Sequence, residues 1–348
     1  NGNSLFVKDL RSPSAEWITV EPSQDNDVQV IGSTDGNLYI LTSADAPNNR
    51  LVVVPIATPQ RANWQELIPE KKDVVLVGAS FAGDKLIVTY NKDASHHAAV
   101  YNNKGEKLND ITMPTYGTVA FSTTPKSDEV FYSFSSFVYP AAVYSYDMST
   151  GESRLLRQAD IEGFNPGDYV TEQVFYTSKD GTRVPMFIVR RKDLKPDAKN
   201  PVYLYGYGGF NIALNPNFSA NRLLWLENGG IYAQANLRGG SEYGEAWHLA
   251  GTLQQKENVF DDFIAAGEYM VDKGWTTPDL LTIEGGSNGG LLVGACVNKR
   301  PDLFRVAIPR VGVMDMLRYH LFTIGWNWAH DYGTSADSPE MANYLIAY

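Results

Sequence analysis

The segment Gly285-Gly286-Ser287-Asn288-Gly289 constrains this chain more than any other part of its sequence. An apolar stretch, residues 281–283, runs directly into it, and a run of small and apolar residues follows it. Gly-x-Ser-x-Gly between a strand and a helix is the pattern of a nucleophile elbow, a tight turn that exposes a serine hydroxyl above a sheet. The turn strains the serine backbone, and neighbours with side chains would collide with the adjoining strand and helix. The pattern therefore predicts a strand–turn–helix unit with Ser287 as a nucleophile.

The composition is that of a soluble globular protein, with 43% hydrophobic and 20% charged residues among 348. This length suits two domains. The net charge of −11 argues against a nucleic-acid partner. No apolar run approaches the ~20 residues of a membrane span, so no membrane partner is expected. The single cysteine, Cys296, allows no intrachain disulfide and is expected to be buried behind Ser287. The five histidines and this cysteine form no zinc-spaced cluster, so we expect neither metal nor cofactor.

Residues 1–165 consist of short β-rich runs separated by Asp, Gly and Asn turns, and these runs recur. Leu38, Leu86 and Val130 begin similar strands at separations of 48 and 44 residues, and the strands that follow, at 51, 99 and 143, repeat the same spacing. Four short strands in roughly 40–50 residues is the period of a β-propeller blade. An all-β sandwich is the alternative. We count about three and a half blades, whereas propellers close with about four to eight, so we expect N-terminal sequence to be missing.

Residues 166–348 alternate strands with helices, which predicts a mostly parallel, doubly wound α/β sheet. A hairpin is expected at 173–189, and strands at 201–206, 230–236, 281–286 and 306–309. A long amphipathic helix is expected over 259–273, with one apolar face that contains Phe260, Phe263, Ile264, Gly267 and Met270. Together with the elbow at Ser287, this order is that of an α/β-hydrolase domain.

Three further segments surround the elbow in order: 205–211, 236–244 and 311–316, followed by Asp331-Tyr332-Gly333. Taken together, residues 170–348 closely resemble the prolyl oligopeptidase family of serine peptidases, in which a seven-bladed propeller caps an α/β-hydrolase domain and filters substrates by size. Over the propeller half, the resemblance rests on the repeat period. Ser241 departs from the family pattern, which usually has a third glycine there. The Pro-specific branch resembles the chain more than the branch that cleaves after Arg and Lys, because the candidate pocket is apolar and aromatic.

The chemistry of such a site can be assigned residue by residue. Attack by a serine on a peptide carbonyl places negative charge on oxygen, which needs preorganised donors. In this fold one donor is the backbone N–H of the residue after the serine, here Asn288. The resemblance gives the second role to the hydroxyl of Tyr207, although an aromatic side chain packed beneath a Gly-rich turn is the alternative.

Selectivity for proline needs a flat apolar slot without donors, because the ring of proline carries no N–H. The resemblance implies that Trp328 stacks on this ring and that Phe210, Val313 and Tyr332 line the slot. Trp326 and Trp328 are both candidates by type, and only the resemblance selects Trp328. Short proline-containing peptides are therefore the expected partners of a monomeric cytoplasmic or periplasmic enzyme.

The triad cannot be completed from the sequence. In this fold the acid and the base follow the serine, and past Ser287 only His320 and His330 remain, with acid candidates at Asp302, Asp315, Asp331 and Asp337. His96, His97 and His248 precede the nucleophile. We therefore expect the acid and base beyond Tyr348, and the 348 residues to be inactive alone. Two alternatives stay open: another α/β-hydrolase, such as an esterase or an aminopeptidase, and a catalytically silent binding scaffold.

Overall fold

The computed structural model describes residues 2–12, 14–34 and 36–348, which fold as two compact units. One unit contains residues 1–135, 141–159 and 243–245. The other contains residues 136–140, 160–242 and 246–348. Within the described ranges, no helix is both long enough and apolar enough to cross a membrane.

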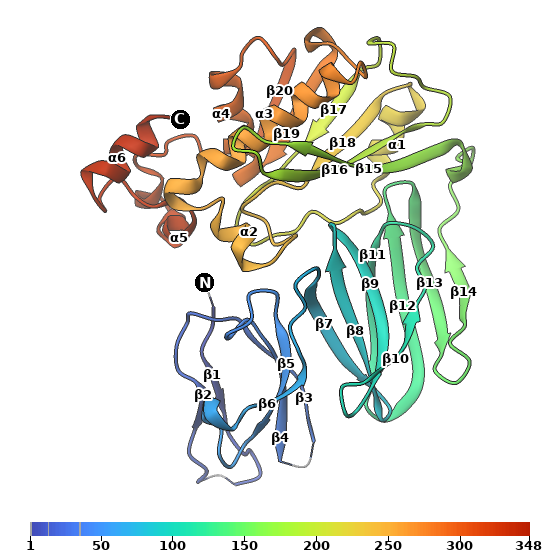
Figure 1. The fold of residues 1–348 in the computed structure, drawn as a ribbon, viewed down its shortest axis with the longest axis vertical. Coiled ribbons are helices and arrows are strands. Elements are labelled where there is room, and N and C mark those ends of the chain that lie inside the picture. Colours follow the sequence, from blue (N-terminus) through green and yellow to red (C-terminus); the bar gives the residue numbers. More distant parts are fainter. Residues whose placement is uncertain (1, 13, 35) are drawn as a thin grey trace. The chain divides into compact units, whose positions relative to one another are not determined.

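The first unit is built from antiparallel sheets whose strands pair in chain order (Figure 1). A strand pair, β1 (Leu5–Val7) and β2 (Ile18–Glu21), comes first. Three four-stranded sheets follow: β3 (Val28–Thr34), β4 (Asn37–Thr42), β5 (Arg50–Pro55) and β6 (Gln65–Ile68); β7 (Val75–Ala82), β8 (Lys85–Lys92), β9 (Ser95–Asn102) and β10 (Lys107–Ile111); β11 (Thr118–Thr124), β12 (Ser127–Ser136), β13 (Tyr139–Asp147) and β14 (Ser153–Gln158). A short 3-10 helix, Arg61–Asn63, precedes β6.

The repeat found in the sequence corresponds to these sheets. Leu38, Leu86 and Val130 lie on the second strand of successive sheets, and the positions 51, 99 and 143 lie on the third. The two faces of the sheet β3–β6 pack into different cores: Ile40 and Val52 join one apolar cluster, whereas Leu41 and Leu51 join another. Because neighbouring residues of a strand point to opposite faces, this sheet is packed on both sides, as a propeller blade is.

The second unit is organised around one six-stranded sheet with the order β15-β16-β18-β17-β19-β20. Its strands are β15 (Tyr169–Thr177), β16 (Arg183–Arg191), β17 (Val202–Tyr205), β18 (Ile231–Ala235), β19 (Leu281–Gly286) and β20 (Val306–Arg310). The β15–β16 hairpin and the β16–β18 ladder are antiparallel, and the three remaining ladders are parallel. The expected mostly parallel sheet is therefore present, with an antiparallel hairpin at one edge. All five residues of β20, at the other edge, are exposed.

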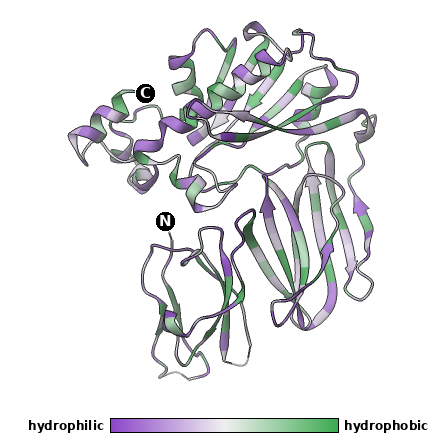
Figure 2. Cartoon of the chain, viewed as in Figure 1, coloured by the Kyte–Doolittle hydropathy of each residue, from purple (hydrophilic) through white to green (hydrophobic). Residues whose placement is uncertain are grey.

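Helices cover both faces of this sheet (Figure 1). On one face, helices α3 (Glu257–Asp272) and α4 (Asn288–Lys299) bury Phe263 and Leu292 against strand residues such as Leu204. On the other face, Tyr203 packs against Trp225 of α1 (Ala220–Glu227), with ring centroids 5.7 Å apart. Figure 2 shows hydrophobic residues along the strands and alternating with hydrophilic ones along the helices. The expected apolar face of α3 is buried, except that Ile264 is only half-buried.

The remaining elements of the chain are short. They are the helices α2 (Glu245–Leu249), α5 (Ala329–Tyr332) and α6 (Pro339–Ile346), and the 3-10 helices Pro166–Asp168, Leu253–Gln255, Pro278–Leu280, Tyr319–Leu321 and Gly325–Trp328. Helix α6 begins with a cap in which the Ser338 hydroxyl accepts the Met341 N–H at 3.1 Å. Between residues 311 and 338 the chain forms only such short elements, and three of the four candidate slot residues, Val313, Trp328 and Tyr332, lie there.

A buried carboxyl group makes the stability of the second unit depend on pH. Burial raises the pKa of Glu242 to about 7, although the Leu214 N–H and the Asn236 amide donate to its Oε1. The pKa of Glu242 is higher in the folded protein than in the unfolded chain, so as the pH rises this carboxyl group ionises at a lower pH in the unfolded chain. The contribution of this group to the free energy of unfolding is therefore complete in acid and is lost as the pH rises through about 7.

We expect Glu242→Gln to raise the free energy of unfolding at pH 8 by about 1–3 kcal/mol, because the amide retains an acceptor and cannot ionise. The gain should be smaller at pH 5. Urea unfolding at both pH values measures this difference. The control is Glu227→Gln, at a side chain of α1 that is exposed and lies outside this buried site. Equal effects of Glu242→Gln at the two pH values would contradict the assignment.

Candidate functional site

Ser287 lies between the last residue of β19 and the first residue of α4. Its backbone has a φ of 56° and a ψ of −116°, and its side chain is exposed. The Ser287 N–H donates to the Arg310 carbonyl oxygen at 2.9 Å, which fixes the turn against the end of β20. A positive φ at a residue with a side chain is strained, so the surroundings must hold it. The serine hydroxyl is thereby presented at the N-terminal end of α4, where backbone N–H groups favour negative charge.

The glycines of the elbow are required by close contacts with backbone. A Cβ at Gly285 would lie 2.3 Å from the Gly289 carbonyl oxygen, and one at Gly289 would lie 2.7 Å from the Gly206 carbonyl oxygen. At Gly290 it would lie 2.5 Å from the Cα of Gly312. These contacts place the loops that follow β17 and β20 directly against the elbow. Gly286, the variable position of the motif, has open space where its Cβ would be.

Tyr207 belongs to the loop that follows β17 and is half-buried. Burial, together with the charge of Asp331, raises the pKa of the Tyr207 hydroxyl, so this hydroxyl keeps its proton and can donate. Phe210 and Asn211, in the same loop, have φ values of 57° and 56°. The loop therefore contains two strained residues shortly after the tyrosine.

Asn288 connects the elbow to two other segments. Its side-chain Nδ2 donates to the Tyr207 carbonyl oxygen at 2.5 Å, and its Oδ1 accepts from the Tyr332 hydroxyl at 3.0 Å. Its backbone N–H is one of the first of α4, which have no acceptor within the helix. We expected only the backbone of Asn288 to matter. The structure adds a structural role for the side chain, which is buried.

Three of the candidate slot residues are connected by ring contacts that run through Tyr319. Phe210 packs edge-on against Tyr332 at 5.3 Å, Tyr332 packs edge-on against Tyr319 at 5.4 Å, and Tyr319 stacks on Trp328 at 6.3 Å. Trp328 and Phe210 are half-buried, whereas Tyr332 is 1% exposed. Trp326, the other candidate tryptophan, is 65% exposed.

Val313 follows β20 in the segment that Gly290 holds near the elbow. It is half-buried and packs against the core of the unit. The structure thus places Phe210, Trp328 and Tyr332 in one aromatic cluster, with Val313 on a separate loop of the same unit.

Each acid candidate has partners of its own. Asp302 pairs with Arg300, Asp315 with Arg318, and Asp337 with Thr334, while Asp331 contacts His248 and Lys256. His320 packs against Tyr319, and the exposed His330 packs edge-on against Phe210 at 5.9 Å. In the part of the chain that the structure describes, the Ser287 hydroxyl forms no hydrogen bond. Each of the four acid candidates therefore already has a hydrogen-bond or ion-pair partner.

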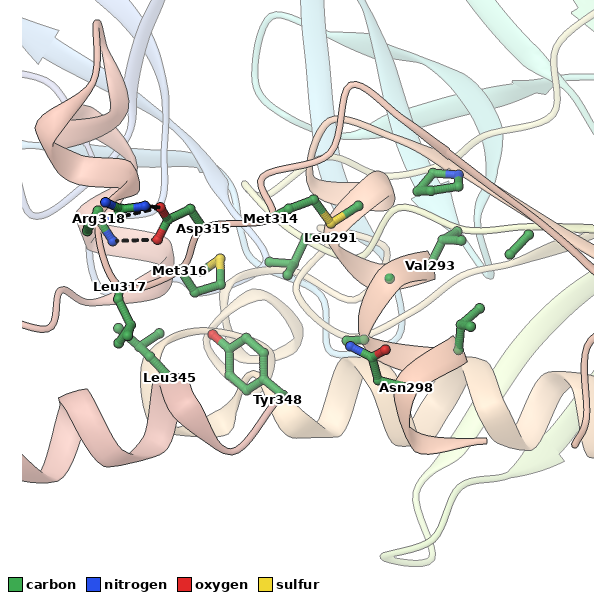
Figure 3. A pocket seen from close by; sticks show the side chains of 15 residues that line it. Leu291, Val293, Asn298, Met314, Asp315, Met316, Leu317, Arg318, Leu345 and Tyr348 are labelled. Carbon is green, nitrogen blue, oxygen red and sulfur yellow. Dashed lines mark hydrogen bonds and ion pairs between the residues drawn. The ribbon is translucent and has the colours of Figure 1, made fainter. Parts of the chain in front are cut away.

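Two further features of this unit bear on ligands. A cavity of about 680 Å³ opens beside α4, between the loop 314–318 and the end of α6 (Figure 3). Leu291, Met316 and Tyr348 line it, and the ion pair between Asp315 and Arg318 lies at one side. Ser287, Tyr207 and Trp328 are not among its lining residues, so it is separate from the elbow. Over the described ranges, no three His, Cys, Asp or Glu side chains come together in an arrangement that could bind a metal ion.

The fold and this geometry define an α/β-hydrolase unit with an exposed elbow serine, joined to a unit of blade-like sheets. Comparison with known families agrees: residues 216–348 match the prolyl oligopeptidase family, and residues 1–159 match the prolyl oligopeptidase N-terminal beta-propeller domain. The chain belongs to the prolyl oligopeptidase family.

Individual relatives are similar along the whole chain. The prolyl endopeptidase of Elizabethkingia meningoseptica is 46% identical over 349 residues, which cover 100% of this chain and 49% of the relative. The prolyl endopeptidase of Dictyostelium discoideum is 42% identical, over 92% of this chain and 43% of its own length. The chain spans about half the length of the curated relatives it matches.

Solved structures show the same fold. One, from a structural and mechanistic analysis of two prolyl endopeptidases, has a TM-score of 0.93 and 43% identity, and the match covers 100% of this chain and 51% of the other. Prolyl oligopeptidase B from Galerina marginata, bound to a 25mer macrocyclization substrate, has a TM-score of 0.93 and 32% identity, over 98% of this chain and 48% of the other.

Proposed function

We propose that the full-length protein is a serine endopeptidase that cleaves short peptides on the carboxyl side of proline. The observation that carries this proposal is the strained, exposed Ser287 at the start of α4, with the Tyr207 loop held against it by Asn288. Family membership and the relatives named prolyl endopeptidase support the substrate class.

In the proposed reaction, the Ser287 hydroxyl loses its proton to a base, and its oxygen attacks the carbonyl carbon of the proline residue. The carbonyl oxygen becomes negative and accepts hydrogen bonds from the Asn288 N–H and the Tyr207 hydroxyl. The tetrahedral intermediate then collapses, the amine leaves with a proton, and water hydrolyses the acyl-enzyme. The proline ring lies against Trp328, with Phe210, Val313 and Tyr332 around it. We place the base and its acid outside these 348 residues, because the described aspartates have other partners.

The remaining parts of the proposal concern organisation and location. We assign residues 1–165 to a propeller domain and residues 166–348 to the catalytic domain. We infer a monomer in the cytoplasm or periplasm that acts on short proline-containing peptides and uses no cofactor.

Chromogenic peptide substrates with proline or arginine before the scissile bond, compared with an acyl ester, distinguish the proposed activity from another hydrolase. Hydrolysis of none of them would favour a binding scaffold.

The first prediction concerns the nucleophile. A fluorophosphonate probe should label the full-length protein at Ser287, and Ser287→Ala should abolish this labelling. The 348 residues alone should label poorly, because a serine hydroxyl without a base is a weak nucleophile. Mass spectrometry of the labelled peptide identifies the site. Label on another serine would refute the assignment of Ser287, and strong labelling of the 348 residues would place the base among them.

The second prediction concerns the oxyanion. In the full-length protein, Tyr207→Phe should lower kcat on the order of 100-fold with a small change in KM, because the lost donor acts mainly in the transition state. Steady-state kinetics on a proline substrate measures this. Tyr205→Phe, which removes a hydroxyl from β17 two residues earlier, is the matched control and should retain kcat. An unchanged kcat for Tyr207→Phe would leave Tyr207 a packing role only.

The third prediction concerns selectivity. Trp328→Ala should lower kcat/KM for a proline substrate by roughly tenfold to a hundredfold, and much less for an alanine substrate, because only the proline ring loses its stacking face. The exposed Trp326 provides the control, Trp326→Ala, which should leave the ratio of the two substrates unchanged. If Trp328→Ala lowers both substrates equally and unfolds at a lower temperature, Trp328 belongs to the core.

A further inference from the structure

Three ionisable side chains are fully buried behind the Tyr207 loop. Lys256, His248 and Asp331 are at most 1% exposed. The Asp331 carboxylate contacts both others: its Oδ1 lies 3.1 Å from His248 Nε2, and its Oδ2 lies 3.4 Å from Lys256 Nζ. Lys256 also lies over the Tyr332 ring, 5.2 Å from its centroid. No step of the proposed reaction uses this cluster, although burying charges is unfavourable unless they are paired.

The cluster holds the backbone of the Tyr207 loop. Lys256 Nζ donates to the Gly208 carbonyl oxygen at 3.1 Å, and Asp331 Oδ1 accepts from the Phe210 N–H at 3.2 Å. Gly208 and Phe210 both have positive φ values, of 63° and 57°. Glycine adopts such a conformation freely, whereas at Phe210 it persists only where the surroundings impose it.

Asn288 holds the preceding carbonyl group, that of Tyr207 itself. From the Tyr207 carbonyl group to the Phe210 N–H, the backbone that follows the Tyr207 side chain is therefore bound to buried polar side chains.

The charges of the cluster are mutually dependent. Burial lowers the pKa of the Lys256 ammonium, and the Asp331 carboxylate acts against this shift. Burial alone would raise the pKa of Asp331, but the hydrogen bond with His248 and the charge of Lys256 bring it below its usual value. Asp331 is therefore held as an anion that accepts from three groups at once.

We propose that Asp331, together with Lys256, is a positioning residue that fixes the Tyr207 loop so that the Tyr207 hydroxyl points at the oxyanion. This inference rests on the proposed function, in which Tyr207 donates to the oxyanion. Asp331 acts through Tyr207 and does not itself touch substrate. Substitution of Asp331 should therefore lower kcat only in a protein that still has the Tyr207 hydroxyl.

The test is a double-mutant cycle on kcat in the full-length protein, with a proline peptide as substrate. Asp331→Asn should lower kcat by tenfold to a hundredfold with little change in KM. In a Tyr207→Phe background the same substitution should lower kcat less than threefold, because the hydroxyl that it misplaces is already absent. An equal loss in both backgrounds would show a general structural role and overturn the inference.

Two further variants keep this test decisive. Lys256→Met removes the donor to Gly208 and should show the same dependence on Tyr207, which covers the case in which Asp331→Asn does not fold. Asp337→Asn is the matched control, because Asp337 forms hydrogen bonds with Thr334 in the same segment, and kcat of this variant should be unchanged.

If the fluorophosphonate probe labels the wild type at Ser287 but Tyr207→Phe alone retains kcat, the oxyanion assignment and this inference both fail. If Tyr207→Phe behaves as expected and the cycle is additive, only the inference fails.

Discussion

At Ser287 the chain passes from a strand to a helix within one residue, with a φ of 56° that few residues with side chains adopt. A conformation of this kind costs about 1–3 kcal/mol. It is held here by the bond from the Ser287 N–H to Arg310 and by backbone contacts at Gly285, Gly289 and Gly290. The same contacts bring the loops after β17 and β20 against the elbow. The positions of Tyr207 and Val313 therefore follow from the way the turn at Ser287 is packed.

The glycines and the serine of the motif carry different information. Gly285, Gly289 and Gly290 are excluded from having side chains by neighbouring backbone, and this would be true whether or not the site were active. These three glycines therefore indicate the fold and carry no information about activity. The exposed hydroxyl on a strained residue has no comparable packing reason, so Ser287 itself is the part of the motif that argues for chemistry.

Much of the fold could be predicted from the sequence because it depends on local patterns. The spacing of Leu38, Leu86 and Val130 marks the repeated sheets, and the apolar positions of 259–273 mark α3. The order of strands in the six-stranded sheet could not be read in this way, since the pairing of β16 with β18 joins segments separated by β17 and α1.

The buried cluster was missed for the same reason. Lys256 and Asp331 lie 75 residues apart, and His248 and Asp331 lie 83 residues apart, without a motif that links them. Lys256 stands in a polar stretch that resembles an exposed turn, and the sequence presents Asp331 only as a possible triad acid and as part of the segment Asp331-Tyr332-Gly333. The aromatic cluster was accessible only in part: the resemblance chose Trp328, whereas the contact of Trp328 with Tyr319 required the structure.

Cys296 gives the core behind the elbow a built-in reporter. Its thiol is buried on α4, lies 3.7 Å from the Phe260 carbonyl oxygen of α3, and has a pKa that burial raises. It is the only cysteine of the 348 residues. A thiol in this position reacts only when the core around it opens. The rate at which a thiol reagent modifies Cys296 therefore measures how often the core behind Ser287 opens, and the measurement needs no substrate.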